Sequence, residues 1–72
     1  MYRYLVVFEK TRSGYSAYVP DLPGCVATGP DKAATEVSIY EAIKFHLEGL
    51  NIEQEEIPLG KAESEVFVFD RD

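Results

Sequence analysis

The 72-residue chain carries 13 acidic residues against 7 Lys and Arg, so its formal net charge is −6. A chain this short forms one small domain that buries only about 60% of the surface its unfolded form exposes, and oligomerisation would add stability. The negative charge disfavours unaided binding to nucleic acid and favours basic partners, although it would also serve solubility alone. With a single Cys25, no leader and no apolar run approaching the ~20 residues of a membrane span, we expect a cytoplasmic protein.

The first half of the chain predicts three short strands. Residues 2–9 (YRYLVVFE) are apolar on both alternating faces, which is typical of a central strand. A polar connection ending in Gly14 separates them from residues 15–19, so the pair reads as an antiparallel hairpin. Residues 25–28 form a third strand, which Gly29 and Pro30 stop.

A sharp corner separates the second and third strands. Two prolines enclose an apolar pair, and a glycine closes the turn, because proline lacks an amide donor and fixes φ. Asp21 would order this turn through a bond from its side chain to the backbone, and Cys25 after it would be a small buried hydrophobe. The residues that form this structural corner are Pro20, Pro23, Gly24 and Cys25.

A helix is predicted from Asp31, the expected N-cap, to about Glu48, with Gly49 as the C-cap or just past it. Its apolar residues recur at helical spacing and should face the sheet: Ala33, Val37, Tyr40, Ile43 and Leu47. A polar connection over residues 53–60 leads to a last strand at residues 65–69 (EVFVF).

These elements predict an α+β fold of β-β-β-α-β order. Three strands in a meander followed by a right-handed helical crossover place the last strand beside the first, giving a four-stranded mixed sheet of order 3-2-1-4 with one helix on one face. The second face would remain apolar and uncovered, so we expect a homo-oligomer, dimer or tetramer, or a docked partner. The aromatic residues assigned to that oligomer face are Tyr2, Tyr4, Phe67 and Phe69.

Candidate catalytic residues are few. In the expected topology the carboxylates of Glu9, Glu36 and Asp70 could converge as a divalent-metal nuclease site, although the inward positions of the first strand carry no acid. His46 has no second histidine or paired cysteine. We therefore expect no enzyme activity, no catalytic residue, no metal and no cofactor, and keep the metal-dependent nuclease as the alternative.

The motif Gly-Tyr-Ser-Ala-Tyr-Val-Pro-Asp-Leu-Pro-Gly-Cys at residues 14–25, with Ala-Thr-Gly at residues 27–29, resembles the HicB antitoxin family. His46 to Leu50 and Ile57-Pro58 extend the resemblance over nearly the whole chain. The resemblance implies a partial ribonuclease-H-like domain, self-assembly, and binding to HicA, a small basic toxin that cleaves messenger RNA. Full-length members also carry a C-terminal DNA-binding domain. This chain stops at Asp72, so we expect one HicB-like domain over residues 1–72, no DNA-binding domain and no direct DNA binding.

The sequence thus predicts a protein-binding module that neutralises a small basic RNase toxin by covering its RNA-binding face. A solitary oligomeric relative without a toxin would use the same surfaces and stays open as an alternative. The partner contacts are expected at the corner and at the acidic connection: Tyr18, Asp21, Leu22, Glu53, Glu55 and Glu56.

Overall fold

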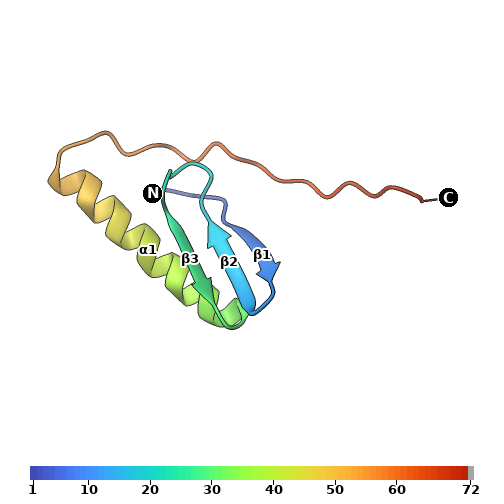
Figure 1. The fold of residues 1–72 in the computed structure, drawn as a ribbon. Coiled ribbons are helices and arrows are strands. Elements are labelled where there is room, and N and C mark those ends of the chain that lie inside the picture. Colours follow the sequence, from blue (N-terminus) through green and yellow to red (C-terminus); the bar gives the residue numbers. More distant parts are fainter. Residues whose placement is uncertain (72) are drawn as a thin grey trace.

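The computed structural model describes residues 1–71 as three antiparallel strands followed by one helix, an α+β arrangement (Figure 1). The strands pair in the order β1-β2-β3, and α1 packs across one face of this sheet. The elements are β1 (Val7–Thr11), β2 (Gly14–Tyr18), β3 (Val26–Gly29) and α1 (Lys32–Ile52).

The expected hairpin is present, but β1 is shifted toward its turn. Val7 pairs with Tyr18 and Thr11 with Gly14, so the ladder closes tightly around the turn. Residues 2–6 lie outside the ladder, because β2 ends at Tyr18 and offers them no partner. Tyr4, Val6 and Phe8 nevertheless pack against the core, so Tyr4 does not lie on the uncovered face to which the sequence assigned it.

The corner between β2 and β3 is a closed double turn. The Leu22 amide donates to the Val19 carbonyl and the Cys25 amide to the Leu22 carbonyl, each at 3.0 Å. The Val19 amide donates back to the Cys25 carbonyl, which continues the ladder across the corner. Gly24 takes a φ of 83°, a left-handed value that other residues rarely adopt. The corner thereby contributes much of the small core, which consists of Ala17, Val19, Leu22, Cys25 and Ile39.

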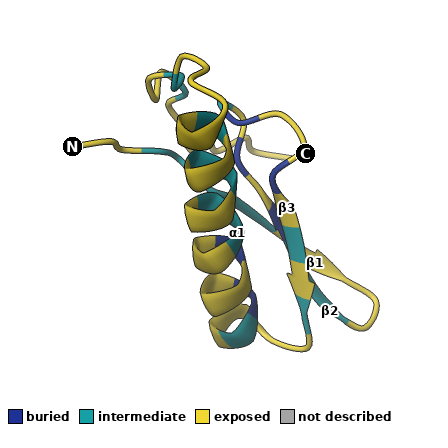
Figure 2. Ribbon diagram, turned by 90° about the vertical axis from the view of Figure 1, so that its left-hand side faces the viewer, coloured by how far each residue is buried: buried dark blue, intermediate teal, exposed yellow. Residues whose placement is uncertain are grey.

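The helix begins as predicted but buries a different face. Asp31 caps it by accepting a hydrogen bond from the Ala34 amide at 2.8 Å. Thr35 and Ile39 are buried, whereas Val37 and Tyr40, expected to face the sheet, are 65% and 62% exposed. The side of α1 turned toward the strands carries its buried positions, and the rest of the helix surface is largely exposed (Figure 2). Thr35 can be buried although it is polar, because its hydroxyl donates a hydrogen bond to the Asp31 carbonyl and is not left unpaired. Ala33 is exposed as well, while Ile43 and Leu47 pack against the core as expected.

The helix continues past Gly49, so the predicted C-cap at that residue is wrong. The end is instead a Schellman motif with Glu53 as C-cap and Gln54 in the left-handed region at φ 58°. The Glu55 amide donates to the Leu50 carbonyl at 2.9 Å, and the Gln54 amide donates to the Asn51 carbonyl at 3.1 Å. These bonds let the helix extend to Ile52 without a glycine at its end.

Residues 1–71 do not form the expected fourth strand. Residues 64–71, hereafter the arm, are extended but pair with no strand, and they project away from the sheet (Figure 1). Val66, Phe67, Val68 and Phe69 are between 70% and 88% exposed. The predicted order 3-2-1-4 is therefore present only as its 3-2-1 part. Among the described residues β1 pairs only with β2, so its other edge is open.

Candidate partner-binding surface

Asp21 anchors the chain just before the arm. Its Oδ2 accepts hydrogen bonds from the Lys61 amide at 3.0 Å and the Ala62 amide at 2.9 Å. The sequence suggested that Asp21 would order its own turn, but the bonded amides lie about forty residues away. The corner and the C-terminal part of the chain are thereby joined through one carboxylate.

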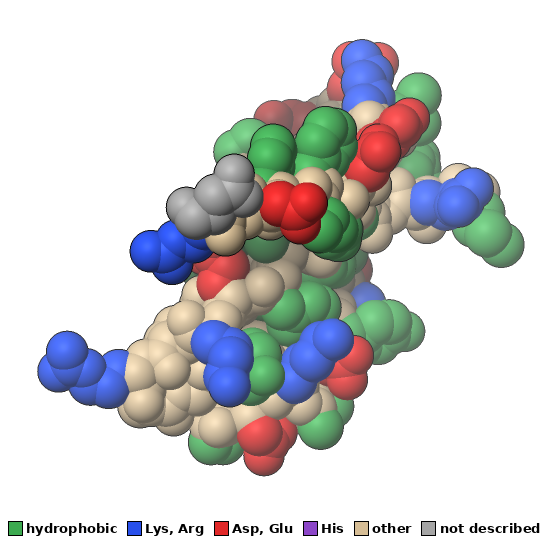
Figure 3. Space-filling view, turned by 90° about the vertical axis from the view of Figure 1, so that its right-hand side faces the viewer, with side chains coloured by type: hydrophobic (Ala, Val, Ile, Leu, Met, Phe, Trp, Pro, Cys, Tyr) green, Lys and Arg blue, Asp and Glu red, His purple; other side chains and the backbone are tan. Residues whose placement is uncertain are grey.

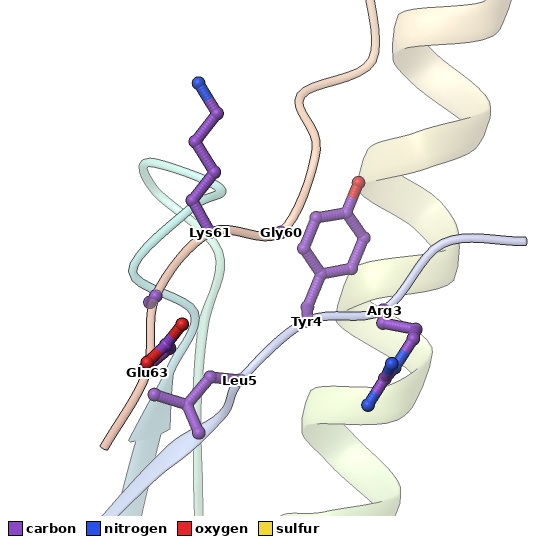
Figure 4. A pocket seen from close by; sticks show the side chains of 7 residues that line it. Arg3, Tyr4, Leu5, Gly60, Lys61 and Glu63 are labelled. Carbon is purple, nitrogen blue, oxygen red and sulfur yellow. The ribbon is translucent and has the colours of Figure 1, made fainter. Parts of the chain in front are cut away.

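A second contact, made by Tyr4, holds the segment that follows the helix. The Tyr4 hydroxyl donates to the Pro58 carbonyl, and burial raises the pKa of the Tyr4 phenol, with smaller contributions from Tyr2 and Asp21. Gly60 crosses the main chain of Arg3 so closely that a Cβ at Gly60 would lie 1.7 Å from the Arg3 carbonyl oxygen. The two segments together line a shallow depression of about 410 Å³, formed by Arg3, Tyr4, Leu5, Gly60, Lys61, Ala62 and Glu63 (Figure 4).

The acidic connection expected to meet a partner directly follows the helix. Glu53, Glu55 and Glu56 are all exposed. The Schellman motif holds Glu53 and Glu55 close, and their side-chain hydrogen bond, together with charge repulsion, raises the pKa of the Glu55 carboxyl. The three carboxylates thus follow the helix end closely in sequence and face solvent.

The corner presents its predicted contacts unequally. Tyr18 lies on the sheet face opposite the helix, beside Val7 and Val26 in the ladder, and is exposed together with Val26. Leu22 is 0% exposed, so its side chain supports the corner from inside and offers no surface to a partner. Asp21 is partly exposed but uses one carboxylate oxygen internally.

The other corner residues fall into two groups. Pro20, Pro23 and Gly24 are exposed at the tip, whereas Cys25 is buried. Burial raises the pKa of the Cys25 thiol, which keeps it protonated and unreactive. Cys25 is thus a core residue.

The residues assigned to an oligomer face are not gathered on one surface. Tyr4 packs against the core and its ring stacks on Tyr2 with centroids 6.4 Å apart, while Phe67 and Phe69 stand exposed on the arm. Figure 3, which views the side from which the arm projects, shows hydrophobic side chains at the surface interspersed with acidic and basic ones. The arm therefore holds most of the uncovered aromatic surface in this group.

The three carboxylates considered for a metal site do not converge. Among residues 1–71 there is no group of three or more His, Cys, Asp or Glu side chains placed to hold a metal ion. The convergence of Glu9, Glu36 and Asp70 required the last strand to lie beside β1, but Asp70 lies on the projecting arm. Within the described residues, Glu9, Glu36 and Asp70 are therefore not brought together as that alternative expected. His46, also weighed, lies half-buried in the helix.

The described part of the chain also has no helix long and apolar enough to cross a membrane. Residues 1–71 form a small α+β module in which the segment after the acidic connection is anchored by Tyr4 and Asp21 and the apolar arm projects.

The comparisons with known proteins give the family. The sequence model described as "HicB_like antitoxin of bacterial toxin-antitoxin system" matches residues 4–68. The chain therefore belongs to the HicB-like antitoxin family, as its sequence motifs predicted, and this family is one of antitoxins rather than a known family of enzymes.

Two relatives are similar over most of the chain. An uncharacterized 14.9 kDa protein in the rep-hol intergenic region of Haemophilus phage HP1 is 40% identical over 55 residues, which cover 76% of this chain but 41% of the phage protein. A Helicobacter pylori protein named UPF0150 protein is 40% identical over 48 residues, 67% of each chain. No solved structure matches. The chain thus spans less than half the length of the phage relative.

Proposed function

We propose that this chain is the partner-binding module of a toxin-antitoxin system and that it neutralises a small basic, mRNA-cleaving toxin of the HicA type by direct binding. The family match over residues 4–68 carries the proposal. The toxin would meet the acidic connection and the exposed side of the corner, where Tyr18 offers an exposed aromatic surface.

Charge supports this choice of partner. The net charge of −6 raises the rate of encounter with a cationic protein. The face with which a toxin binds RNA would be cationic, because it meets a phosphate backbone. Glu53 and Glu55 follow the helix end, where main-chain hydrogen bonds fix the backbone, and both side chains are exposed to a partner. Covering the toxin's RNA-binding face would exclude its substrate.

Residues 1–72 act as one HicB-like domain in the cytoplasm, self-associate as a dimer or tetramer, and bind protein rather than DNA, since their charge repels phosphate. The ribonuclease-H-like sheet of order 3-2-1-4 would be completed if residues 65–69 paired along β1.

The test is co-expression with the small open reading frame that adjoins the gene, followed by co-purification and an RNA-cleavage assay. The 72-residue chain should co-purify with a small basic protein and suppress its cleavage of RNA. Association should also slow as ionic strength rises, because charge steering is screened by salt.

A matched pair of charge reversals locates the contact. The triple variant Glu53→Lys, Glu55→Lys, Glu56→Lys should lose neutralisation, whereas Glu36→Lys, Glu41→Lys, Glu48→Lys should retain it, since these exposed helix residues change the net charge equally. If both triples neutralise alike, the acidic connection is not the contact. If the unaltered chain binds no neighbour-encoded protein, a solitary relative is the better description.

A further inference from the structure

The outer edge of β3 presents main-chain groups that could pair with a further strand. The Val19 amide donates to the Cys25 carbonyl at 3.2 Å, so these two residues form a hydrogen-bonded pair at the end of the ladder between β2 and β3. Bonding alternates along an antiparallel ladder, which directs the main-chain groups of Ala27 toward β2 and those of Val26 and Thr28 away from it. Among the described residues β3 pairs with no strand besides β2. The amide and the carbonyl of Val26 and of Thr28 therefore line an open edge.

The helix lies beside this edge. α1 packs mainly on β3 and β2, and Figure 1 shows it next to β3, at the opposite end of the sheet order from β1. Its first turn is fixed against the end of β3, because a Cβ on Gly29 would lie 2.6 Å from the Thr35 hydroxyl oxygen. A strand added to the β3 edge would therefore run alongside α1.

The side of α1 that turns toward the β3 edge is small and apolar. Its residues recur at intervals of three or four and form a stripe: Ser38, Ala42, Phe45, Gly49 and Ile52. Around the helix, the buried Thr35 lies between this stripe and Lys32, whose Nζ is 5.2 Å from the ring centroid of Phe8 in β1. The stripe therefore faces away from β1. Phe45 is 79% exposed, and a Cβ on Gly49 would meet nothing within 4 Å, so the stripe is open to a partner.

Acidic side chains border the stripe. Glu41 and Glu48 are exposed and lie next to it on the solvent side of the helix. Lys44 is directed to another side, since its Nζ lies 5.8 Å from the ring centroid of Tyr40. The charge beside the stripe is thus negative, which favours a segment that carries Lys or Arg.

We propose that the β3 edge and the stripe bind an extended, basic segment of another protein, which joins the sheet as a strand beside β3. The outward amides and carbonyls of Val26 and Thr28 supply the hydrogen bonds, and the stripe receives the side chains of one face of the segment. Lys and Arg suit that face, because their apolar stems pack on the stripe while their charges reach Glu41 and Glu48. The surface is separate from the acidic connection, so the inference goes beyond the proposed function and does not rest on it.

Charge and position disfavour segments of this same chain at the β3 edge. The arm starts on the other side of the sheet, since Gly60 crosses Arg3 in the segment that leads into β1. Its Glu65 would also meet Glu41 and Glu48 at the stripe. A second copy paired edge to edge would bring two identical acidic borders together, which is unfavourable for the same reason.

The probe is a capped octapeptide, Arg-Thr-Val-Thr-Arg-Thr-Val-Thr, which places Arg and Val on one face of a strand and Thr on the other. Added at up to about 2 mM to the isotope-labelled 72-residue chain, it should shift the NMR signals of the Val26, Thr28 and Phe45 amides. The same peptide with Glu in place of Arg should bind at least about 10-fold more weakly, because its carboxylates would face Glu41 and Glu48.

Methylation of the peptide amides distinguishes strand pairing from charge attraction alone. A paired strand bonds β3 through every second residue. Methylating the amides that face β3 should therefore weaken binding by about 10-fold, whereas methylating the alternate amides should leave it unchanged. If the two methylated peptides bind alike, no strand is added and the proposal is wrong.

Two pairs of protein variants locate the binding surface. Thr28→Pro removes an outward amide while the ladder to β2 stays intact, and it should weaken binding by about 10-fold. Lys10→Pro is the matched control on the outer edge of β1, because the pair of Lys10 with Tyr15 also lies between hydrogen-bonded pairs, and it should leave binding intact. Phe45→Gln should weaken binding several-fold, whereas Val37→Gln, at an exposed position outside the stripe, should not.

Three results would overturn the proposal. The first is a peptide that shifts no signal of β3, or shifts only those of residues 53–56. The second is equal binding by the two proline variants, or by the two glutamine variants. The third is a shift of the Val26 and Thr28 signals with the concentration of the chain alone, which would show that a second copy fills the edge.

Discussion

The carboxylate of Asp21 holds the main-chain amide of Ala62 at 2.9 Å, which ties the corner between β2 and β3 to the segment that precedes the arm. The same oxygen accepts from Lys61, so two donors depend on one residue. The path of the chain from the helix end to the arm is therefore set at the corner.

Two substitutions of Asp21 should weaken this connection to different extents. Asp21→Ala should lower the free energy of unfolding by about 2 kcal/mol, because hydrogen bonds to a charged group are worth more than neutral ones. Asp21→Asn keeps an acceptor oxygen and should lose about half of that. Urea denaturation measures both, and equal stability of parent and alanine variant would show that the bonds contribute nothing.

Tyr4→Phe removes only the hydroxyl that reaches Pro58. The variant should be less stable by about 1 kcal/mol at neutral pH. Because the pKa of Tyr4 is raised in the folded state, the contribution is full below the ordinary tyrosine pKa of about 10 and is lost as pH rises through the raised value. Unfolding curves of parent and variant should therefore converge at alkaline pH, and a constant gap would contradict this cause.

Gly60→Ala tests the crossing over Arg3. A Cβ at residue 60 cannot coexist with the Arg3 carbonyl, so the segment should detach, with a loss of about 1–3 kcal/mol. Gly49→Ala is the matched control, since nothing lies near a Cβ there, and removing a glycine from the helix should stabilise by about 0.5–1 kcal/mol. Thermal unfolding of the two variants should thus shift in opposite directions.

Gln54→Gly should stabilise the protein. Gln54 occupies the left-handed position of the Schellman motif, a conformation that costs a residue with a Cβ about 1–2 kcal/mol. The gain should be about 1 kcal/mol or less, because glycine also gives the unfolded chain more freedom. A destabilised variant would mean that the Gln54 side chain makes a compensating contact.

The titration of Glu55 should depend on its neighbour. Its raised pKa means that the hydrogen-bonded pair is favoured at acid pH and that repulsion from Glu53 grows as pH rises through the raised value. Glu53→Gln should lower the Glu55 pKa in an NMR titration, while Glu56→Gln should leave it nearly unchanged. Binding to a basic toxin should accordingly weaken as Glu55 takes up its proton.

The sequence was a good guide wherever structure is set locally. The hairpin from Val7 to Tyr18, the proline corner and the Asp31 cap all follow from residues within a few positions of one another. The family match was likewise predictable, because the corner motif is a short uninterrupted pattern. Local propensity and turn chemistry suffice for such features.

Features that depend on distant partners were missed. The helix carries apolar residues on two sides, and only packing decides that Thr35 and Ile39, rather than Val37 and Tyr40, face the sheet. The bonds of Asp21 to residues 61 and 62 join parts of the chain with no shared pattern. The last strand was predicted from its composition, but pairing within the chain depends on where the anchor directs it.

The hydrogen bonds of Asp21 also separate a held part of the chain from an arm that proteases can reach. A chymotrypsin-like enzyme would cut early at the peptide bonds that follow the exposed Phe67 and Phe69. The fragment N-terminal to the cut would keep the hydrogen bonds of Asp21 and Tyr4. A nicked molecule would keep its core and its acidic end while losing the segment beyond the cut. Limited digestion therefore converts this protein into a trimmed body without unfolding it.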